Sequence, residues 1–267
     1  MMQPDPAHLR VSVDASVGRI ALARPAKLNA LNRALLEELA GAAMWFDEQP
    51  EVKVVVISGD GSAFSAGFDL NDPSWNELGP PEQSAAVGRA MAEAVGNMRA
   101  LTIASIQGHC IGGAVVLASA CDLRIVAAGA TFRIPEVDLG IPLFWTGVPR
   151  LTRELGPALA KELILTGRAF GASEAHAIRF ANRVVSDDEL VNHTSALAAE
   201  LAAKPALVLR MTKQQVEAAA PSVPPTDEGA ARDVADLAAA FADAESREVA
   251  ADYMRQRPRP RTVRLTE

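Results

Sequence analysis

The chain has 267 residues, of which 49% are hydrophobic and 22% are charged, and its formal net charge is −7. This composition excludes wholesale disorder, and the acidic balance argues against a nucleic-acid partner, because phosphate contacts need clustered Lys and Arg. No stretch of about 18 apolar residues occurs and residues 1–10 lack an apolar signal core, so we expect a soluble, cytoplasmic protein without membrane contact.

Strands and helices alternate through the first two thirds of the chain. Leu9–Ala23 alternates branched apolar and polar residues, which predicts a β-hairpin. Asn29–Asp47 has apolar residues at helical spacing, and the apolar run Val52–Ser58 is typical of a buried strand. The remaining predicted elements are a helix over Gln83–Asn97, a strand over Thr102–Gln107, a buried helix over Gly112–Cys121, strands over Leu123–Ala127 and Thr131–Arg133, a loop over Pro135–Pro149, and helices within Thr152–Thr166 and Ser173–Phe180.

The last third is rich in alanine and helical from about Asp187, with interruptions at Pro205 and Pro221–Pro225. The whole pattern predicts an α/β fold with a C-terminal helical extension. We divide the chain into a core over residues 1–200 and a helical region over residues 201–267, which we expect to mediate oligomerisation.

Phosphate-binding and metal-binding motifs are missing from the sequence. Gly59 and Gly61 follow a strand, but Phe64 stands where a dinucleotide-binding pattern needs its third glycine. The histidines are scattered and two cysteines cannot form a four-thiolate zinc site. We therefore predict no metal site and no nucleotide cofactor.

Ser65 lies in a segment that is one glycine short of the nucleophile elbow of serine hydrolases. The elbow should turn directly into a helix, whereas Ser65 leads into a loop that ends near Pro73. A serine hydrolase that uses Ser65 therefore stays a remote alternative.

Two glycine turns carry more information. Gly67-Phe68 and Gly112-Gly113 each follow an apolar strand, and the second turn opens the predicted buried helix. The first N–H groups of a helix lack intrahelical partners, and glycine lets another group approach the backbone closely. Two N–H groups, one from each turn, could form an oxyanion hole. The same glycines could instead only permit tight packing.

Four segments resemble the crotonase (enoyl-CoA hydratase/isomerase) superfamily in order and spacing. They are Arg24–Leu31, Val54–Leu70, Ile106–Arg124 and Phe132–Gly140. The resemblance implies a spiral of ββα units in the core, C-terminal trimerisation helices, and a homotrimer or hexamer. It also implies an acyl-CoA thioester as substrate, with no cofactor beyond the CoA that the substrate itself carries.

The resemblance also assigns roles to residues. The backbone N–H groups of Phe68 and Gly113 would hold the thioester oxygen, and Glu136 would be the catalytic carboxylate. The residues that lie where the family contacts CoA are Ala26, Leu28, Ala66, Asp69 and Leu70. Lys27 and the basic tail Arg255–Arg264 are expected to approach the phosphates of CoA.

The sequence departs from the family's hydratases at their second glutamate, where this chain has Val116. Phe144 is expected to fill the site of the attacking water, so Val116 and Phe144 are the predicted walls of the acyl pocket. The side chains that could line this pocket or fill the core, with the core preferred, are Met44, Trp45, Met91, Phe144 and Trp145. The carboxylates that could replace the missing glutamate are Asp69, Asp72 and Asp138, the last of which would share the face of Glu136 in an extended chain.

These departures favour an isomerase in which Glu136 moves a proton from C2 to C4 of a 3-enoyl thioester and gives the 2-enoyl isomer. Low polarity around Glu136 would raise its pKa and make it a better base. An enoyl-CoA hydratase of fatty-acid metabolism is the first alternative. A non-catalytic acyl-CoA-binding protein is the second.

Overall fold

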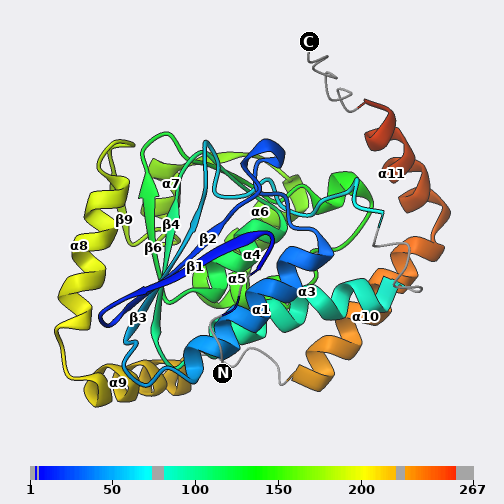
Figure 1. The fold of residues 1–267 in the computed structure, drawn as a ribbon. Coiled ribbons are helices and arrows are strands. Elements are labelled where there is room, and N and C mark those ends of the chain that lie inside the picture. The colour runs from blue at the N-terminus through cyan, green and yellow to red at the C-terminus, as the bar shows by residue number, and fades with distance from the viewer. Residues whose placement is uncertain (1–3, 5, 74–80, 221–225, 257–267) are drawn as a thin grey trace, which may run out of the picture.

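A six-stranded sheet runs through the structure, a computed structural model that describes residues 4, 6–73, 81–220 and 226–256 (Figure 1). In spatial order the strands are β1 (Leu9–Asp14), β2 (Val17–Leu22), β3 (Val54–Gly59), β4 (Leu101–Ile106), β6 (Leu123–Ala127) and β9 (Arg183–Val185). The β1–β2 pair is antiparallel, which confirms the predicted hairpin, and the other neighbours are parallel.

The run of consecutive apolar residues in β3 has a simple cause. Val55 and Ile57 face the main core, whereas Val54 and Val56 face a second apolar cluster on the other side of the sheet. Helices cover both faces, so neither set of alternate residues is left in water. Figure 1 shows α8 on one side and α1 and α4 on the other.

A second sheet of three short strands lies next to the first. Its strands are β5 (His109–Ile111), β7 (Thr131–Arg133) and β8 (Phe170–Gly171), in that order. Of the short strands, β7 was predicted from the sequence, whereas β5, β8 and β9, with two or three residues each, were not.

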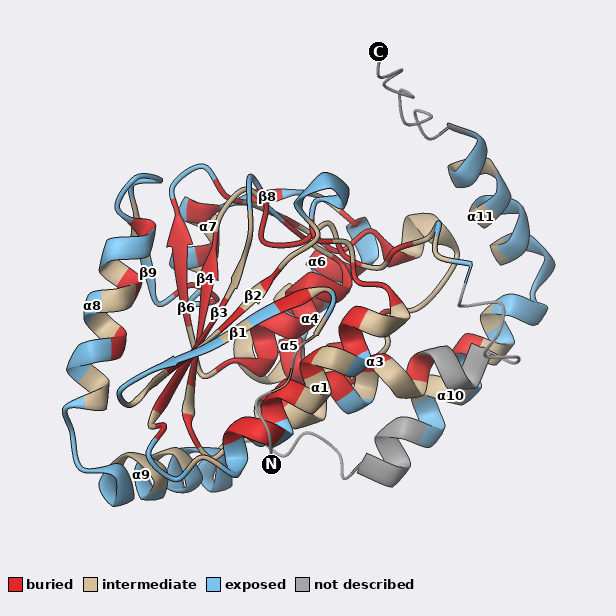
Figure 2. Cartoon of the chain, viewed as in Figure 1, coloured by how far each residue is buried: buried red, intermediate tan, exposed pale blue. Residues whose placement is uncertain are grey.

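The helices of the core follow the predicted order. They are α1 (Arg33–Asp47), α3 (Pro81–Gly96), α4 (Gly113–Ala120), α5 (Gly147–Leu155), α6 (Pro157–Thr166) and α7 (Ala172–Ala177), with 3₁₀ turns η1 (Pro25–Lys27) and η2 (Glu136–Leu139). The first helix begins later than Asn29, because the side chain of Asn32 caps it by accepting a hydrogen bond from the Leu35 N–H at 3.0 Å. Every residue of α4 is buried, which explains its apolar composition all round (Figure 2).

Four helices end the described chain: α8 (Leu190–Ala202), α9 (Ala206–Ala219), α10 (Thr226–Ala242) and α11 (Ala244–Gln256). The first packs on the sheet, α10 packs along α3, and α11 packs against η2. Residues 74–80, residues 221–225 and the part of the basic tail beyond Gln256 lie outside the described residues. Among the described residues, no helix has the length and apolar character needed to cross a membrane.

Candidate functional site

The two glycine turns meet in the structure. Gly67 has φ +80° and Gly112 has φ +54°, conformations that side chains disfavour. A Cβ atom on Gly67 would lie 2.3 Å from the carbonyl oxygen of Ile111 and 3.6 Å from the nitrogen of Gly113. The close approach therefore requires glycine, and it brings the backbone of Phe68 next to the start of α4.

A narrow cavity of about 30 Å³ lies at this junction. The residues that line it are Phe68, Leu70, Gly113, Glu136, Leu139, Ile141, Leu143, Phe144 and Trp145. The two residues of the predicted oxyanion hole and the predicted carboxylate thus border one space. Apart from the carboxyl group of Glu136 and the indole N–H of Trp145, the lining side chains are apolar.

Glu136 is buried, with 7% of its surface exposed, and it opens η2 directly after Pro135. Its Oε1 lies 2.5 Å from the position that a Cβ atom on Gly112 would take, so the carboxyl group sits against the start of α4. Its Oε2 is buried without a hydrogen-bond partner in the part of the chain that the structure describes. Burial raises the pKa of Glu136 from 4.5 to about 7, although a hydrogen bond from its own backbone partly offsets this effect. Near neutral pH the group can therefore both accept and donate a proton.

The indole of Trp145 forms the buried wall of the cavity. A Cβ atom on Gly88 of α3 would lie 1.9 Å from Cε2 of the ring, and a Cβ atom on Gly113 would lie 2.3 Å from Cζ3. Phe144 is partly buried and lines the same cavity, with its ring centroid 5.6 Å from that of Trp145. Trp145 is thus a core residue and a pocket residue at once.

Val116 is not among the residues that line the described cavity, and its expected role as a wall of the acyl pocket stays a prediction. It is fully buried in the main core, and a Cβ atom on Gly147 would lie 2.8 Å from its Cγ2 atom. The pocket residues that the sequence analysis missed are Leu139, Ile141 and Leu143. The sequence feature that could have indicated them is the apolar stretch over residues 139–145, directly after the segment of Glu136.

The carboxylates considered as replacements for the missing glutamate are held elsewhere. Asp69 binds Arg24 at 2.9 Å, and Asp72 accepts a hydrogen bond from the backbone N–H of Arg33 at 3.3 Å. Asp138 lies in the 3₁₀ turn η2 rather than in an extended strand, so it does not share the face of Glu136, and it binds Arg133 at 2.6 Å. Of the described residues, Glu136 is the only carboxylate that lines the cavity.

The residues expected to contact CoA lie on two segments that are joined by hydrogen bonds. Ala26 and Lys27 are exposed in η1, Leu28 is exposed directly after it, and the Ala66 N–H donates to the Leu28 carbonyl at 2.8 Å. An isolated β-bridge between Leu31 and Phe68 joins the same two segments again. A second bridge, between Ser65 and Cys110, joins the loop after β3 to β5, the strand that precedes α4. Leu70 reaches the cavity itself, and Asp69 lies beside it, mostly buried.

Ser65 is fully buried, which contradicts the serine hydrolase alternative. Its hydroxyl donates to the Asn29 carbonyl at 2.8 Å and accepts from the Gly67 N–H at 3.1 Å. A nucleophile must reach its substrate, whereas this hydroxyl holds two backbone segments together.

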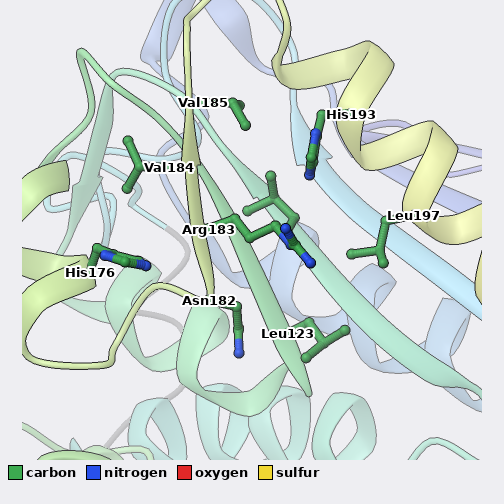
Figure 3. Close-up of a pocket in the computed structure, with 9 residues that line it drawn as sticks. Leu123, His176, Asn182, Arg183, Val184, Val185, His193 and Leu197 are labelled. Atoms are coloured by element: carbon green, nitrogen blue, oxygen red, sulfur yellow. The ribbon is translucent and has the colours of Figure 1, made fainter.

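A second, open cavity of about 590 Å³ lies between the edge of the large sheet and α8 (Figure 3). It is lined by Leu123, Ile125, His176, Asn182, Arg183, Val184, Val185, His193 and Leu197, none of which borders the Glu136 cavity. Within the described ranges, no three His, Cys, Asp or Glu side chains cluster as a metal site would require.

Known proteins are similar to this chain over most of its length. Residues 12–260 match the family model of enoyl-CoA hydratase/isomerase. A probable enoyl-CoA hydratase from Mycobacterium bovis is 37% identical over 212 residues, which are 78% of this chain and 80% of that protein. The peroxisomal Δ(3,5)-Δ(2,4)-dienoyl-CoA isomerase of Arabidopsis thaliana is 35% identical over 218 residues, 77% of this chain and 78% of its own length.

The similarity extends to three dimensions. A Thermobifida fusca structure, named for an enoyl-CoA hydratase and solved in complex with acetoacetyl-CoA, matches with a TM-score of 0.74 and 32% identity. The match covers 88% of this chain and 95% of the other. With the spiral of strands and helices, the paired glycine turns and these relatives in agreement, the chain belongs to the enoyl-CoA hydratase/isomerase family and has the crotonase fold.

Proposed function

We propose that this protein converts 3-enoyl-CoA thioesters into their 2-enoyl isomers, with Glu136 as the single proton carrier. The observation that carries the proposal is the cavity itself. It holds one buried carboxyl group, whose Oε2 has no partner among the described residues, in an otherwise apolar lining next to Phe68 and Gly113.

In this reaction the thioester oxygen accepts hydrogen bonds from the backbone N–H groups of Phe68 and Gly113. The carboxylate of Glu136 removes a proton from C2, and the electron pair spreads over a dienolate whose negative charge lies on that oxygen. Glu136 then returns the proton at C4, so that the double bond moves from C3–C4 to C2–C3 and no water is consumed. The positive end of α4 favours the oxyanion, and one such donor is typically worth about 2.7–4 kcal/mol of barrier.

We assign the CoA moiety to the exposed segment that precedes α1 and to the loop after β3. The contacting residues would be Ala26, Lys27, Leu28, Ala66, Asp69 and Leu70. Lys27 is exposed and suits a phosphate, whereas the carboxylate of Asp69 is bonded to Arg24, so Asp69 would contribute through its backbone. A Thermobifida fusca relative was solved in complex with acetoacetyl-CoA, which supports an acyl-CoA as the ligand.

Hydration of a 2-enoyl-CoA is the second candidate, because the Mycobacterium bovis relative bears the name of a hydratase. A hydratase must hold and activate a water molecule, which two acidic groups do better than one. Here the position of the second acid holds Val116, packed behind Gly147, and the lining offers no other acid among the described residues. We therefore place hydration behind isomerisation.

We also propose that copies of this chain assemble into a homotrimer or hexamer through the helical region 201–267. No residue of the fully described helix α9 is buried, and Leu207, Val208 and Met211 are exposed on it (Figure 2). Apolar side chains gathered on one helix are typical of a surface that another chain covers. Light scattering on the full chain should give three or six times the mass of 28.1 kDa.

The test of the reaction uses the purified wild type and Glu136→Gln, each given 3-butenoyl-CoA or 3-hexenoyl-CoA and, separately, the matching 2-enoyl-CoA. Conversion of the 3-enoyl to the 2-enoyl thioester, reduced by about 10²–10⁴-fold in the variant, is the expected result. Glu162→Gln is the matched control, because this exposed carboxylate pairs with Arg168 and does not line the Glu136 cavity.

Other products would point elsewhere. Formation of 3-hydroxyacyl-CoA from the 2-enoyl substrate, without isomerisation, would establish a hydratase and contradict the proposal. Tight binding of acyl-CoA without any turnover would instead establish a non-catalytic acyl-CoA-binding protein.

A further inference from the structure

The ring of Trp145 occupies the space between α3 and α4 that borders the Glu136 cavity. The pyrrole side of the indole lies against Gly88 and the six-membered ring lies against Gly113, so closely that a Cβ atom on either glycine would overlap the ring. Both positions are buried. The two glycines therefore form a seat whose shape fits this one large side chain.

The loop that carries the ring is fixed by three helices. Thr146 N–H donates to Asp233 of α10 at 2.8 Å, and Nε of Arg150 on α5 donates to the Thr146 hydroxyl at 3.2 Å. A second nitrogen of Arg150 donates to the carbonyl of Ala92 on α3 at 3.1 Å. Trp145 and Thr146 have φ +62° and +59°, which non-glycine residues keep only where their surroundings hold them. The indole is thus a fixed wall.

The indole contributes volume rather than a polar contact. Its Nε1 is buried and finds no hydrogen-bond partner among the described residues, although a buried tryptophan usually finds one. Its ring centroid lies 6.1 Å from that of Phe68 and 5.6 Å from that of Phe144, so aromatic rings hold it on two sides. The remaining cavity is small, about 30 Å³, so the indole leaves little space for an acyl chain.

We propose that Trp145, seated on Gly88 and Gly113, determines the chain length of the substrate and restricts it to short acyl groups. The inference rests on the proposed function, since it takes the acyl group to lie between Phe68, Gly113 and Glu136. A longer chain would have to enter the space between α3 and α4 that the indole fills. Truncation of Trp145 would join this space to the cavity and admit longer chains.

The experiment measures binding, so that it does not depend on turnover. Calorimetry would give the Kd of butyryl-, hexanoyl-, octanoyl- and decanoyl-CoA for the wild type, Trp145→Ala and Trp145→Leu. Burial of one methylene typically improves affinity about fourfold. We expect no gain beyond butyryl-CoA in the wild type, and in Trp145→Ala an octanoyl-CoA affinity at least about tenfold above that of butyryl-CoA.

Trp45→Ala is the matched control. Trp45 is also a buried tryptophan in the main core, but it does not line the cavity, so its truncation should keep the chain-length order of the wild type. Trp145→Leu fills part of the space, so its gain in affinity for longer acyl groups should lie between those of the wild type and Trp145→Ala. This variant keeps the test decisive if Trp145→Ala does not fold.

Two results would overturn the inference. The first is a wild type whose affinity already rises with each added methylene, and the second is a series that Trp145→Ala and Trp145→Leu leave unchanged. If no form of the protein binds any acyl-CoA, the proposed function fails and the inference fails with it. Failure of the inference alone is recognised by acyl-CoA binding without an effect of Trp145.

Discussion

Two groups of buried polar residues in this protein differ in whether their polar atoms have hydrogen-bond partners. The first is built around Asn29, which is fully buried with φ +54°. Its side chain accepts from the Arg24 N–H at 2.9 Å and donates to the carbonyls of Asp60 and Ala63 at 2.9 and 2.8 Å. Ser65 completes the group, because its hydroxyl joins the Asn29 carbonyl to the Gly67 N–H.

The second group is Glu136 with its neighbour Trp145. Oε2 of Glu136 and Nε1 of Trp145 are the two buried side-chain polar atoms without partners in the described ranges, and both residues line the same small cavity. Leaving a buried polar group unpaired typically costs about 1–3 kcal/mol. Such groups are rare in folded proteins, and each calls for an explanation.

The first group therefore has a structural role, whereas the second is placed for chemistry. The satisfied group holds the loop that carries Phe68 in one geometry, and it gains stability in doing so. The unsatisfied group lowers stability but keeps a carboxyl group buried, with its pKa close to neutral. Altering the two groups should therefore change the free energy of unfolding in opposite directions.

The largest expected effect on stability is a gain from Glu136→Gln at high pH. Burial raises the pKa of Glu136 to about 7 in the folded protein from 4.5, so the folded state binds the extra proton between these values. Stability therefore falls as pH rises from about 4.5 to 7 and changes no further above it. Because glutamine is never ionised, the variant should be more stable than the wild type by about 3 kcal/mol at pH 8 and by much less at pH 5.

Urea denaturation of both proteins at fixed protein concentration would measure this difference. Glu162→Gln, at an exposed position, serves as the control and should give no comparable gain. Equal stabilities of Glu136→Gln and the wild type at pH 8 would show that burial does not raise the pKa of Glu136.

The next effect concerns the rate of isomerisation. Only the ionised form of Glu136 can remove a proton from C2, and its pKa is raised by burial to about 7. Below this value kcat/KM should fall about tenfold for each pH unit, reaching about a hundredfold loss at pH 5. A profile of kcat/KM between pH 5 and 9 would measure it, and a flat profile would contradict the role of Glu136 as the base.

Much of the fold could be predicted because its signals are local. The hairpin around Gly18, the buried run in β3 and the all-apolar helix α4 each carry their pattern within a few consecutive residues. The sequence also suggested that the turns at Gly67 and Gly113 could lie together, since both glycines follow strands. The family resemblance then fixed the fold as a whole.

The parts that could not be predicted depend on contacts between distant segments. Nothing near Trp145 in the sequence indicates that Gly88 makes room for it. The face of Asp138 was predicted for an extended chain, but the residues after Pro135 form a 3₁₀ turn that directs it to Arg133 instead. Val116 has the helical position of the family's second acid. Its close contact with Gly147 of α5 joins two segments about thirty residues apart, so the sequence did not indicate it.

The smallest expected effect is that of Ser65→Ala, which breaks the satisfied group without touching the cavity. The variant leaves the Gly67 N–H and the Asn29 carbonyl short of a partner, so we expect a loss of about 1–2 kcal/mol in the free energy of unfolding. Turnover should persist, because the hydroxyl is buried and does not line the cavity. Ser62→Ala, at an exposed position in the same loop, should leave stability unchanged. Release of free CoA by the wild type that disappears in Ser65→Ala would instead revive the serine hydrolase, and the division between a supporting and a reacting group would then have to be reversed.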